Sequence, residues 1–387
     1  MDHVRLGIIG IGNMGMSHSL RIHMEHKVPG LTLGAVCDIS DSRRAWARDS
    51  LPGVAVFENA IEMYDSGLID AVLIAVPHYH HPSLAIEAFA RGLHVLNEKP
   101  AGVYTKQVLE MNAAAKQSGK IFAIMYNQRT NPVYQKVREL VHSGELGALK
   151  RVIWIITDWY RPQAYHDSGS WRSTWEGEGG GTLINQNPHN LDLLQWMLGM
   201  PSRIRSFCSF GKYYDIEVED DVTAYLEYPN GATGVYITST GEAPGTNRLE
   251  ISGDMGKIVV ENNRITFDRN RVSEREHNRI NTDPFRKPEC WRCEIPVSAD
   301  GGEQHIGIMK NFTKAILHGE KLLAPGEEGI HGLLISNAIH YSTWTDDWAE
   351  LDHFDHDHFY ELLQEKINSS TIKKNVVQQV VDVSGSH

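Results

Sequence analysis

Short apolar runs alternate with helix-spaced stretches over the first third of the chain. Parallel strands need crossover connections, and the stretches between the runs are long enough to supply them. The pattern therefore predicts βαβ units and an α/β fold that begins with a Rossmann, doubly wound parallel sheet. The apolar runs lie at 4–9, 31–37, 71–76, 94–96 and 121–125, and the clearest helical stretches lie at 83–91 and 105–118.

Strand-like alternation and hairpin turn signals replace this pattern near residue 126. The Asn230-Gly231 turn separates two runs, 222–228 and 234–238, which is typical of a β-hairpin. We therefore expect a C-terminal α+β domain with an antiparallel sheet rather than a second doubly wound unit. The other expected elements are strands at 151–157, 249–252 and 257–260, helices at 132–141, 306–317, 330–343 and 357–367, and a solvated loop at 268–290.

The length of the chain predicts more than one domain. A chain of 387 residues is too long for one compact core and suits domains of ordinary size. We expect a dinucleotide-binding domain at 1–125, a substrate-binding and oligomerisation domain at 126–350, and a polar, partly helical tail at 351–387 whose end is disordered.

Charge and composition exclude several classes of protein. The chain has 37 Lys and Arg against 49 Asp and Glu, a net charge of −12, which argues against nucleic acid or an anionic membrane as partner. No run approaches the roughly 20 apolar residues that span a bilayer. The N-terminal residues enter a strand pattern with no cleavage site, so we expect a cytoplasmic protein. Four cysteines make no disulfide framework, and the Cys290/Cys293 pair lacks further ligands, so we expect no metal.

A glycine-rich turn follows the first expected strand and opens a helix. This context is the one that a dinucleotide-binding fingerprint requires. The first glycine permits a tight turn, the second lets the backbone approach a pyrophosphate, and the third lets helix and strand pack closely. The helix N-terminus then supplies amide donors for the phosphates. The residues are Gly10, Ile11, Gly12, Asn13, Met14 and Gly15.

An acidic residue ends the second expected strand. Asp38 comes 23 residues after Gly15, where a carboxylate can accept hydrogen bonds from the adenosine ribose hydroxyls. The same carboxylate repels a 2′-phosphate, so the expected cofactor is NAD rather than NADP. Arg43 and Arg44 lie nearby and could soften that preference.

A lysine follows the strand expected at 94–96. The carboxyl ends of strands in such a sheet face the ligand crevice, so Lys99 is expected beside the nicotinamide. Pro100 restricts the residue before it and thereby fixes how the lysine is presented. The alternative is a surface lysine before a turn proline.

A histidine is expected in the first turn of a second-domain helix. Asn187 suits the N-cap and Pro188 the first helical position, which places His189 in the first turn. The positive end of the helix dipole disfavours an imidazolium, so His189 can accept a proton. Asp192, three residues on, shares its face. The alternative is a hydrogen bond between His189 and Asp192 that serves packing alone.

Together these motifs resemble the Gfo/Idh/MocA family of glucose–fructose oxidoreductase and inositol dehydrogenase. The fingerprint at Gly10–Gly15, the triplet Glu98-Lys99-Pro100 and the helix with His189 and Asp192 after a Gly-Gly-Gly run occur in that family's order and spacing, over roughly residues 3–345. The resemblance implies a second domain with a large, open, mostly antiparallel sheet. It also implies NAD(P)-dependent oxidation or reduction of a secondary alcohol of a sugar or cyclitol.

The resemblance assigns roles to individual residues. Lys99 would stabilise negative charge on the reacting oxygen, and His189 would be the general base in oxidation. Besides the fingerprint and Asp38, the cofactor-binding residues would be Ala75, Pro77, His81, Glu98, Lys99, Gln128, Trp171 and Arg172. The substrate-binding residues would be Lys99, Asn127, Asp158, Tyr160, Asn185 and His189.

One position departs from the family pattern. Many relatives carry an aspartate four residues before the histidine, where this chain has Asn185. An amide can hold a hydroxyl but can neither exchange a proton nor offset the charge on Lys99. Proton transfer would then rest on His189.

Three functions follow as candidates. The first is an NAD-dependent oxidoreductase that acts on a secondary hydroxyl of a sugar, glycoside or cyclitol, as a homodimer or homotetramer. The second is an NAD-dependent glycoside-processing enzyme that uses transient oxidation at C3 and elimination. The third is a non-catalytic NAD-binding regulatory protein, against which the presence of both Lys99 and His189 speaks.

Overall fold

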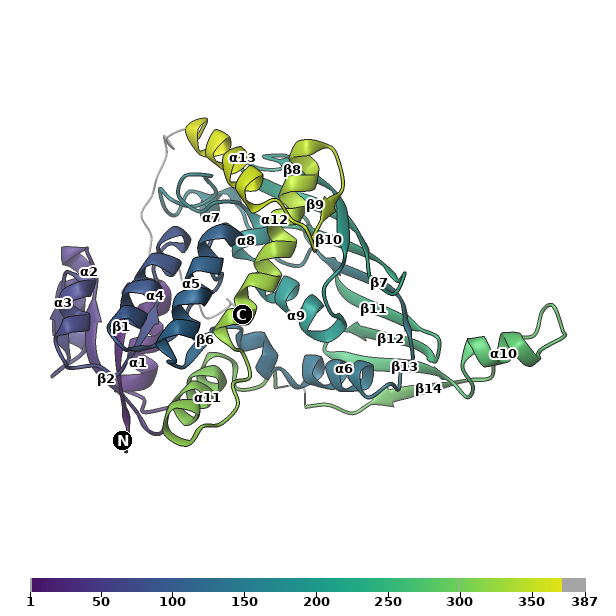
Figure 1. Cartoon of the computed structure of the whole chain (residues 1–387), viewed down its shortest axis with the longest axis horizontal. Coiled ribbons are helices and arrows are strands. Elements are labelled where there is room, and N and C mark those ends of the chain that lie inside the picture. The colour runs from purple at the N-terminus through teal and green to yellow at the C-terminus, as the bar shows by residue number, and fades with distance from the viewer. Residues whose placement is uncertain (1, 299, 371–387) are drawn as a thin grey trace.

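The computed structural model describes residues 2–298 and 300–370. Two sheets, one of six strands and one of nine, form the centres of two lobes joined by helices (Figure 1). The structure thus confirms a parallel Rossmann sheet followed by a second domain with a mostly antiparallel sheet.

The first sheet is parallel, in the order β3-β2-β1-β4-β5-β6. The chain moves outward from β1 to β3 and then returns to the other side of β1, so the strand order reverses between β1 and β4. In open α/β sheets a ligand crevice lies at this reversal, outside the carboxyl ends of the strands. The strands are β1 (Val4–Ile9), β2 (Leu31–Cys37), β3 (Ala55–Phe57), β4 (Ala71–Ile74), β5 (His94–Asn97) and β6 (Phe122–Ile124), and the helices are α1 (Asn13–His23), α2 (Asp41–Ser50), α3 (Ala60–Asp65), η1 (His78–His80), α4 (His81–Ala90) and α5 (Thr105–Ser118).

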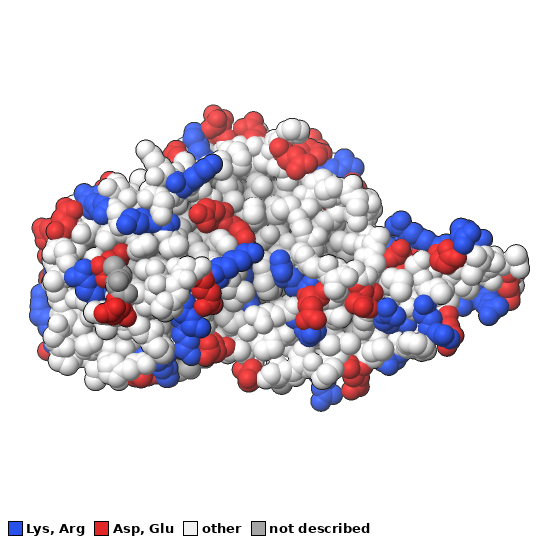
Figure 2. Space-filling model, turned by 60° about the horizontal axis from the view of Figure 1, so that its bottom comes forward, with Lys and Arg blue, Asp and Glu red and all other residues white. Residues whose placement is uncertain are grey.

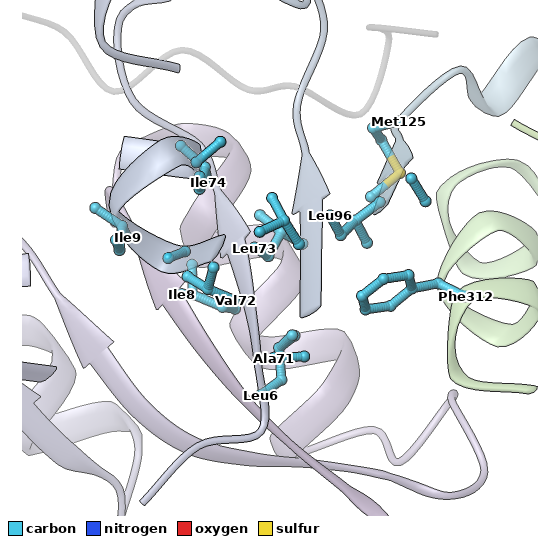
Figure 3. Packing of buried hydrophobic residues seen from close by; sticks show 14 of the residues in the cluster. Leu6, Ile8, Ile9, Ala71, Val72, Leu73, Ile74, Leu96, Met125 and Phe312 are labelled. Atoms are coloured by element: carbon cyan, nitrogen blue, oxygen red, sulfur yellow. The ribbon is translucent and has the colours of Figure 1, made fainter. Parts of the chain in front are cut away.

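Apolar side chains cover both faces of this sheet. Leu6, Ile8 and Leu73 are fully buried, as expected for a parallel strand covered on both sides. Phe312 of helix α11 (Gln304–His318) belongs to the same cluster and lies near Leu96 and Met125 (Figure 3). A helix from late in the chain therefore completes the core of the first lobe.

The second sheet has nine strands in the order β14-β13-β12-β11-β7-β10-β9-β8-β15. All its neighbours pair antiparallel except β7 and β10, which run parallel. The strands are β7 (Leu149–Ile156), β8 (Arg203–Phe210), β9 (Glu219–Glu227), β10 (Thr233–Ser239), β11 (Asn247–Gly253), β12 (Gly256–Glu261), β13 (Arg264–Asn270), β14 (Cys290–Ile295) and β15 (Ala349–Glu350).

Helices of this lobe lie mainly between the two sheets (Figure 1). The long helix α12 packs on both β8 and α9, and α6 packs on α9. These helices bury the inner face of the nine-stranded sheet. They are η2 (Asn127–Thr130), α6 (Pro132–His142), α7 (Gln163–His166), α8 (Thr182–Asn185), α9 (Pro188–Leu198), η3 (Gly326–Glu328), α12 (Gly329–Thr345) and α13 (His356–Asn368).

The structure corrects the prediction of a loop at 268–290. Strand β13 continues to Asn270, and helix α10 (Glu274–Ile280) occupies the middle of the segment. Ser273 caps α10 by accepting a hydrogen bond from the Glu276 amide at 3.1 Å. No residue of α10 is buried. Local capping and charge, rather than an apolar face, therefore mark this helix, which projects from the body of the molecule (Figure 1).

The tail expected at 351–387 is described as far as residue 370, and it contains α13 close to its expected bounds. The disordered end expected beyond it lies outside the described residues. No helix within 2–298 and 300–370 is long and apolar enough to cross a membrane. On the face shown in Figure 2, basic and acidic side chains are interspersed.

Candidate active site

The glycine turn between β1 and α1 has the geometry that a dinucleotide requires. Gly10 has a φ of +85°, and a Cβ there would lie 2.4 Å from the Ala75 carbonyl oxygen. A Cβ on Gly15 would lie 1.9 Å from the Gly10 oxygen, whereas a Cβ on Gly12 would meet no protein atom within 4 Å. Two glycines are therefore needed for protein packing, and the space beside Gly12 is open to a phosphate.

The N-terminus of α1 points into this open space. Gly12 is its N-cap and has no side chain to occupy the first amides. These amides can therefore bind an anion, as the fingerprint predicts. The residues present fit a dinucleotide pyrophosphate.

Replacing Gly12 by alanine tests this geometry. The φ of Gly12 is −72°, so alanine fits the backbone and the fold should be unaffected. The new methyl group projects toward the pyrophosphate position, so we expect the Kd for NADH to rise about tenfold or more, at about 1.4 kcal/mol for each factor of ten. Fluorescence titration measures the affinity and thermal unfolding the stability. Unchanged NADH affinity would contradict the assignment.

Asp38 lies at the end of β2 and contacts the glycine turn directly. Its Oδ2 accepts from the Ile11 amide at 2.7 Å and its Oδ1 from the Ser40 amide at 2.8 Å. Each carboxylate oxygen keeps a second lone pair with which it can accept from a ribose hydroxyl. Arg44 donates to the Asp38 carbonyl oxygen and pairs with Asp41, so its guanidinium is already engaged by the protein.

Lys99 follows β5 and reaches across to the second lobe. Its Nζ donates to the carbonyl oxygen of Asn185 at 2.8 Å, and the peptide bond to Pro100 is cis. Burial lowers the pKa of Lys99 from its ordinary value, whereas the nearby carboxylates of Glu98 and Glu178 raise it. Lys99 is therefore a partly buried side chain bonded to the second lobe rather than a surface lysine before a turn.

Glu98 is fixed beneath Lys99. Its Oε1 lies 2.6 Å from Nε2 of His18, and its Oε2 accepts from the Lys99 amide at 3.2 Å. Burial opposes the charge of Glu98, but the hydrogen bond and charge of His18 outweigh it and lower the pKa of Glu98 to about 2. The carboxylate thus holds the backbone from which Lys99 extends.

His189 is the second residue of α9, as expected, and is 3% exposed. The capping of this helix differs from the expectation. Asn187 occupies the N-cap, but its side chain makes no cap hydrogen bond. It instead donates to the Thr182 hydroxyl at 2.8 Å and accepts from the Tyr236 hydroxyl at 2.7 Å. Asn187 therefore joins α8, α9 and the sheet behind His189.

Asp192 is bonded to a residue far away in the sequence. Its two oxygens accept from Nε and Nη2 of Arg129 at 2.8 and 2.6 Å, and both side chains are 1% exposed. Arg129 also donates to Glu328 at 2.6 Å. Asp192 thus joins α9 to η2 and η3, and its two oxygens are turned to Arg129.

Loss of this ion pair should destabilise the fold. Arg129→Met leaves a buried carboxylate without its counter-charge, so we expect the free energy of unfolding to fall by about 3–5 kcal/mol. Urea unfolding followed by fluorescence measures it. Arg138→Met is the control, because Arg138 donates to the Trp196 carbonyl and stacks on its ring, and pairs with no carboxylate in the described part of the chain. Equal losses in both variants would contradict this role.

Glu178 was not anticipated as a site residue. Its carboxylate is buried and accepts hydrogen bonds from the side-chain amide of Asn185 and from the Ser173 amide. Its carbonyl oxygen lies 3.2 Å from Nδ1 of His78. The one signal in the sequence is position, since Glu178 immediately precedes the Gly-Gly-Gly run.

The remaining expected residues lie in several parts of the structure. His81, 1% exposed, lies between the Pro100 and Val76 carbonyl oxygens at 2.7 and 2.8 Å, and so ties the Lys99 turn to β4. Asn127 and Gln128 both donate to Gln304 at the start of α11. On the second lobe Trp171 contacts His78, Arg172 stacks on Trp171 and donates to Tyr165, and Tyr160 is 45% exposed. Also expected were Ala75, next to the Gly10 turn, and the exposed Pro77 and Asp158.

A lysine that follows strand β5 of the nucleotide-binding sheet is thus bonded to the helices of the second lobe that carry Asn185 and His189. Lys99 comes from the first lobe, and Asn185 and His189 come from adjacent helices of the second. An ammonium can stabilise an oxygen that gains negative charge, and an imidazole can take or give a proton. The geometry suits proton-coupled chemistry at a hydroxyl or carbonyl carbon.

Family models match both lobes. Residues 4–126 match the model described as an oxidoreductase family with an NAD-binding Rossmann fold. Residues 134–259 match the C-terminal domain of the GFO/IDH/MocA family.

Named relatives span nearly the whole chain. Levoglucosan dehydrogenase of Pseudarthrobacter phenanthrenivorans is 24% identical over 91% of this chain and 99% of its own. Myo-inositol 2-dehydrogenase of Thermotoga maritima is 23% identical over 87% and 95%. The WlbA dehydrogenase of Bordetella pertussis, solved with NADH and UDP-GlcNAcA, superposes with a TM-score of 0.76 at 25% identity, over 90% of this chain and 98% of its own.

Proposed function

Because the chain belongs to the Gfo/Idh/MocA family of NAD-binding oxidoreductases, we propose that it transfers a hydride between NAD and a secondary hydroxyl of a sugar, glycoside or cyclitol. The observation that carries the proposal is the bond from Lys99 to the Asn185 carbonyl, four residues before His189. It joins the lysine of the first lobe to the segment of the second lobe that leads into the helix of His189. The relatives named for levoglucosan and inositol support the substrate class.

Oxidation of the alcohol removes a proton from its hydroxyl and a hydride from its carbon. Bound NAD supplies the acceptor for the hydride that leaves the carbinol carbon. His189 takes the hydroxyl proton, and Lys99 stabilises the oxygen as the carbonyl forms. In the reverse direction His189 returns the proton to the oxygen.

The parts of the chain have separate tasks in this proposal. Residues 1–125 hold NAD through the glycine turn and Asp38, with Pro77 and His81 bordering the nicotinamide end, where Gln128 joins them from the second part of the chain. Residues 126–350 hold the substrate, with Asn127, Asp158 and Tyr160 as contacts beyond the reacting carbon. Residues 351–387 form the tail.

The outer face of the nine-stranded sheet is the proposed oligomer interface. Large side chains on β8 and β9 are exposed there, with Phe207 at 63% and Tyr225 at 38%. Exposed apolar side chains on the open face of a large sheet favour association, so we propose a homodimer or homotetramer. Sedimentation at micromolar concentration tests it, and a monomer would contradict it.

A substrate panel tests the activity. The protein is incubated with NAD and with cyclitols, free sugars and glycosides, while NADH absorbance and released aglycone are both followed. Growth of absorbance with a polyol or sugar supports the proposal. Release of aglycone that requires NAD but gives no net NADH supports the alternative of transient oxidation at C3 followed by elimination. No turnover of any member, with NADH bound, would favour a regulatory protein and contradict the proposal.

A further inference from the structure

A buried carboxylate lies against the position where this chain departs from its family. Glu178 is 1% exposed, and its Oε1 accepts from the amide nitrogen of Asn185. Its Oε2 accepts from the Ser173 amide at 2.6 Å. An amide and a carboxylate thus share the place in which many relatives have a single aspartate.

The amide of Asn185 is oriented by its neighbours. Its nitrogen donates to Glu178 and also to the Tyr165 hydroxyl at 3.1 Å. With both N–H bonds used in this way, the group that Asn185 can offer to a substrate hydroxyl is the acceptor Oδ1. The carboxylate of Glu178 therefore helps to fix the orientation of the Asn185 amide.

Lys99 lies between charges of both signs. Its ammonium interacts electrostatically with the carboxylates of Glu98 and Glu178 and with the guanidinium groups of Arg161 and Arg172. Glu98 is already bonded to His18, whereas Glu178 lies on the Asn185 side, where Lys99 donates. Lys99 also interacts electrostatically with His78, His81 and His305.

We propose that Glu178 is a positioning residue that supplies, from seven residues upstream, the negative charge that relatives place at position 185. It keeps Lys99 protonated and holds the Asn185 amide with Oδ1 toward the reacting hydroxyl. The inference rests on the proposed function for its catalytic meaning. The charge relation between Glu178 and Lys99 is independent of any substrate.

A reciprocal exchange separates charge from packing. In Glu178→Gln, the new amide nitrogen faces the Asn185 amide nitrogen, so a hydrogen bond and a charge are lost together. In Glu178→Gln combined with Asn185→Asp, the glutamine introduced at position 178 accepts from the Ser173 amide and donates to the carboxylate introduced at position 185. The hydrogen bonds remain, with the two that Asn185 donates, to position 178 and to the Tyr165 hydroxyl, both reversed, and the charge moves to the family position.

The protonation of Lys99 is the first readout. Reductive methylation with formaldehyde at a series of pH values, read at this lysine by mass spectrometry, gives its titration midpoint. We expect the midpoint to fall in Glu178→Gln, because an opposing charge that favours the ammonium is removed. We expect the double variant to recover the wild-type midpoint. Glu176→Gln is the matched control, since Glu176 lies in the same loop and is exposed.

The second readout is turnover of an alcohol found in the panel. We expect kcat to fall about tenfold in Glu178→Gln, with a smaller change in KM for NAD, and to recover in part in the double variant. The alkaline limb of the pH profile should move to lower pH in the single variant alone. A purely structural role of Glu178 would move neither the titration of Lys99 nor this limb.

The possible outcomes distinguish failure of this inference from failure of the proposed function. A Lys99 midpoint unchanged in Glu178→Gln overturns the inference. Loss of NADH binding in both the single and the double variant also overturns it, by assigning Glu178 to holding the 171–178 loop. If the single variant does not fold, Glu178→Asp, which keeps the charge, must titrate like wild type at Lys99. Failure of the whole substrate panel with a shifted midpoint would overturn the proposed function and leave the charge relation established.

Discussion

Replacement of Lys99 by methionine is expected to lower kcat for alcohol oxidation by about 10²- to 10³-fold, the usual loss when one group that stabilises a developing oxyanion is removed. Methionine nearly preserves the length of the side chain and removes its charge. The glycine turn and Asp38 are untouched, so NADH should still bind. Stopped-flow or steady-state absorbance gives kcat, and fluorescence titration gives NADH affinity.

The physical reason for so large a loss is the setting of Lys99. Its Nζ is fixed by the Asn185 carbonyl at 2.8 Å, so the ammonium is held in place before substrate arrives. Little reorganisation is then needed when the oxygen gains charge. Lys116→Met, at the exposed end of α5, is the control and should leave kcat unchanged. A Lys99→Met enzyme with more than about a tenth of wild-type kcat would contradict the role.

The pH dependence follows from the same group. Burial lowers the pKa of Lys99 from its ordinary value, with carboxylates in partial opposition. The charged form exists below the pKa and is lost as pH rises through it. Activity should therefore decline on the alkaline side earlier than an ordinary lysine would allow. The Lys99→Met enzyme should lack this limb.

Local patterns were sufficient to predict most of the fold. Strand β1 begins and ends at its expected residues, because a parallel strand buried on both faces is a continuous apolar run with clear ends. Helix α10 was missed because it buries no residue, so no apolar period marks it. A hydrophobic pattern reveals a helix or strand through the side chains that it buries in a core. Helix α10 buries none, so the pattern does not reveal it.

The elements of the candidate site were predictable as far as its motifs are local. The glycine turn and the helix of His189 each lie within a dozen residues, so spacing alone places their parts. Arg129 and Asp192 are 63 residues apart, and their contact depends on how α9 packs on η2. That contact is set by tertiary packing, which a single sequence does not display. Glu178 is only seven residues from Asn185, but the turn between them has no periodic pattern that predicts which side chains meet.

Replacement of His189 by asparagine is expected to lower kcat by about 10²- to 10⁴-fold, the range typical for loss of a general base. Asparagine is polar and of similar reach, so it suits the first turn of α9, but it cannot take a proton at neutral pH. NADH affinity should remain close to that of wild type, because His189 lies in the second lobe. A solvent deuterium isotope effect larger than in wild type would show that proton transfer has become limiting.

Two further enzymes sharpen this test. His142→Asn, at the exposed end of α6, should retain wild-type kcat. The Lys99→Met, His189→Asn double variant should be scarcely slower than the worse single variant, since groups that act on one proton and one oxygen lose their effect together. Multiplication of the two losses would instead mean that Lys99 and His189 serve separate steps. If kcat of the His189→Asn enzyme stays within about tenfold of wild type, another group must accept the proton. The first candidate is His78, a buried histidine that lies against the Glu178 carbonyl and interacts electrostatically with Lys99.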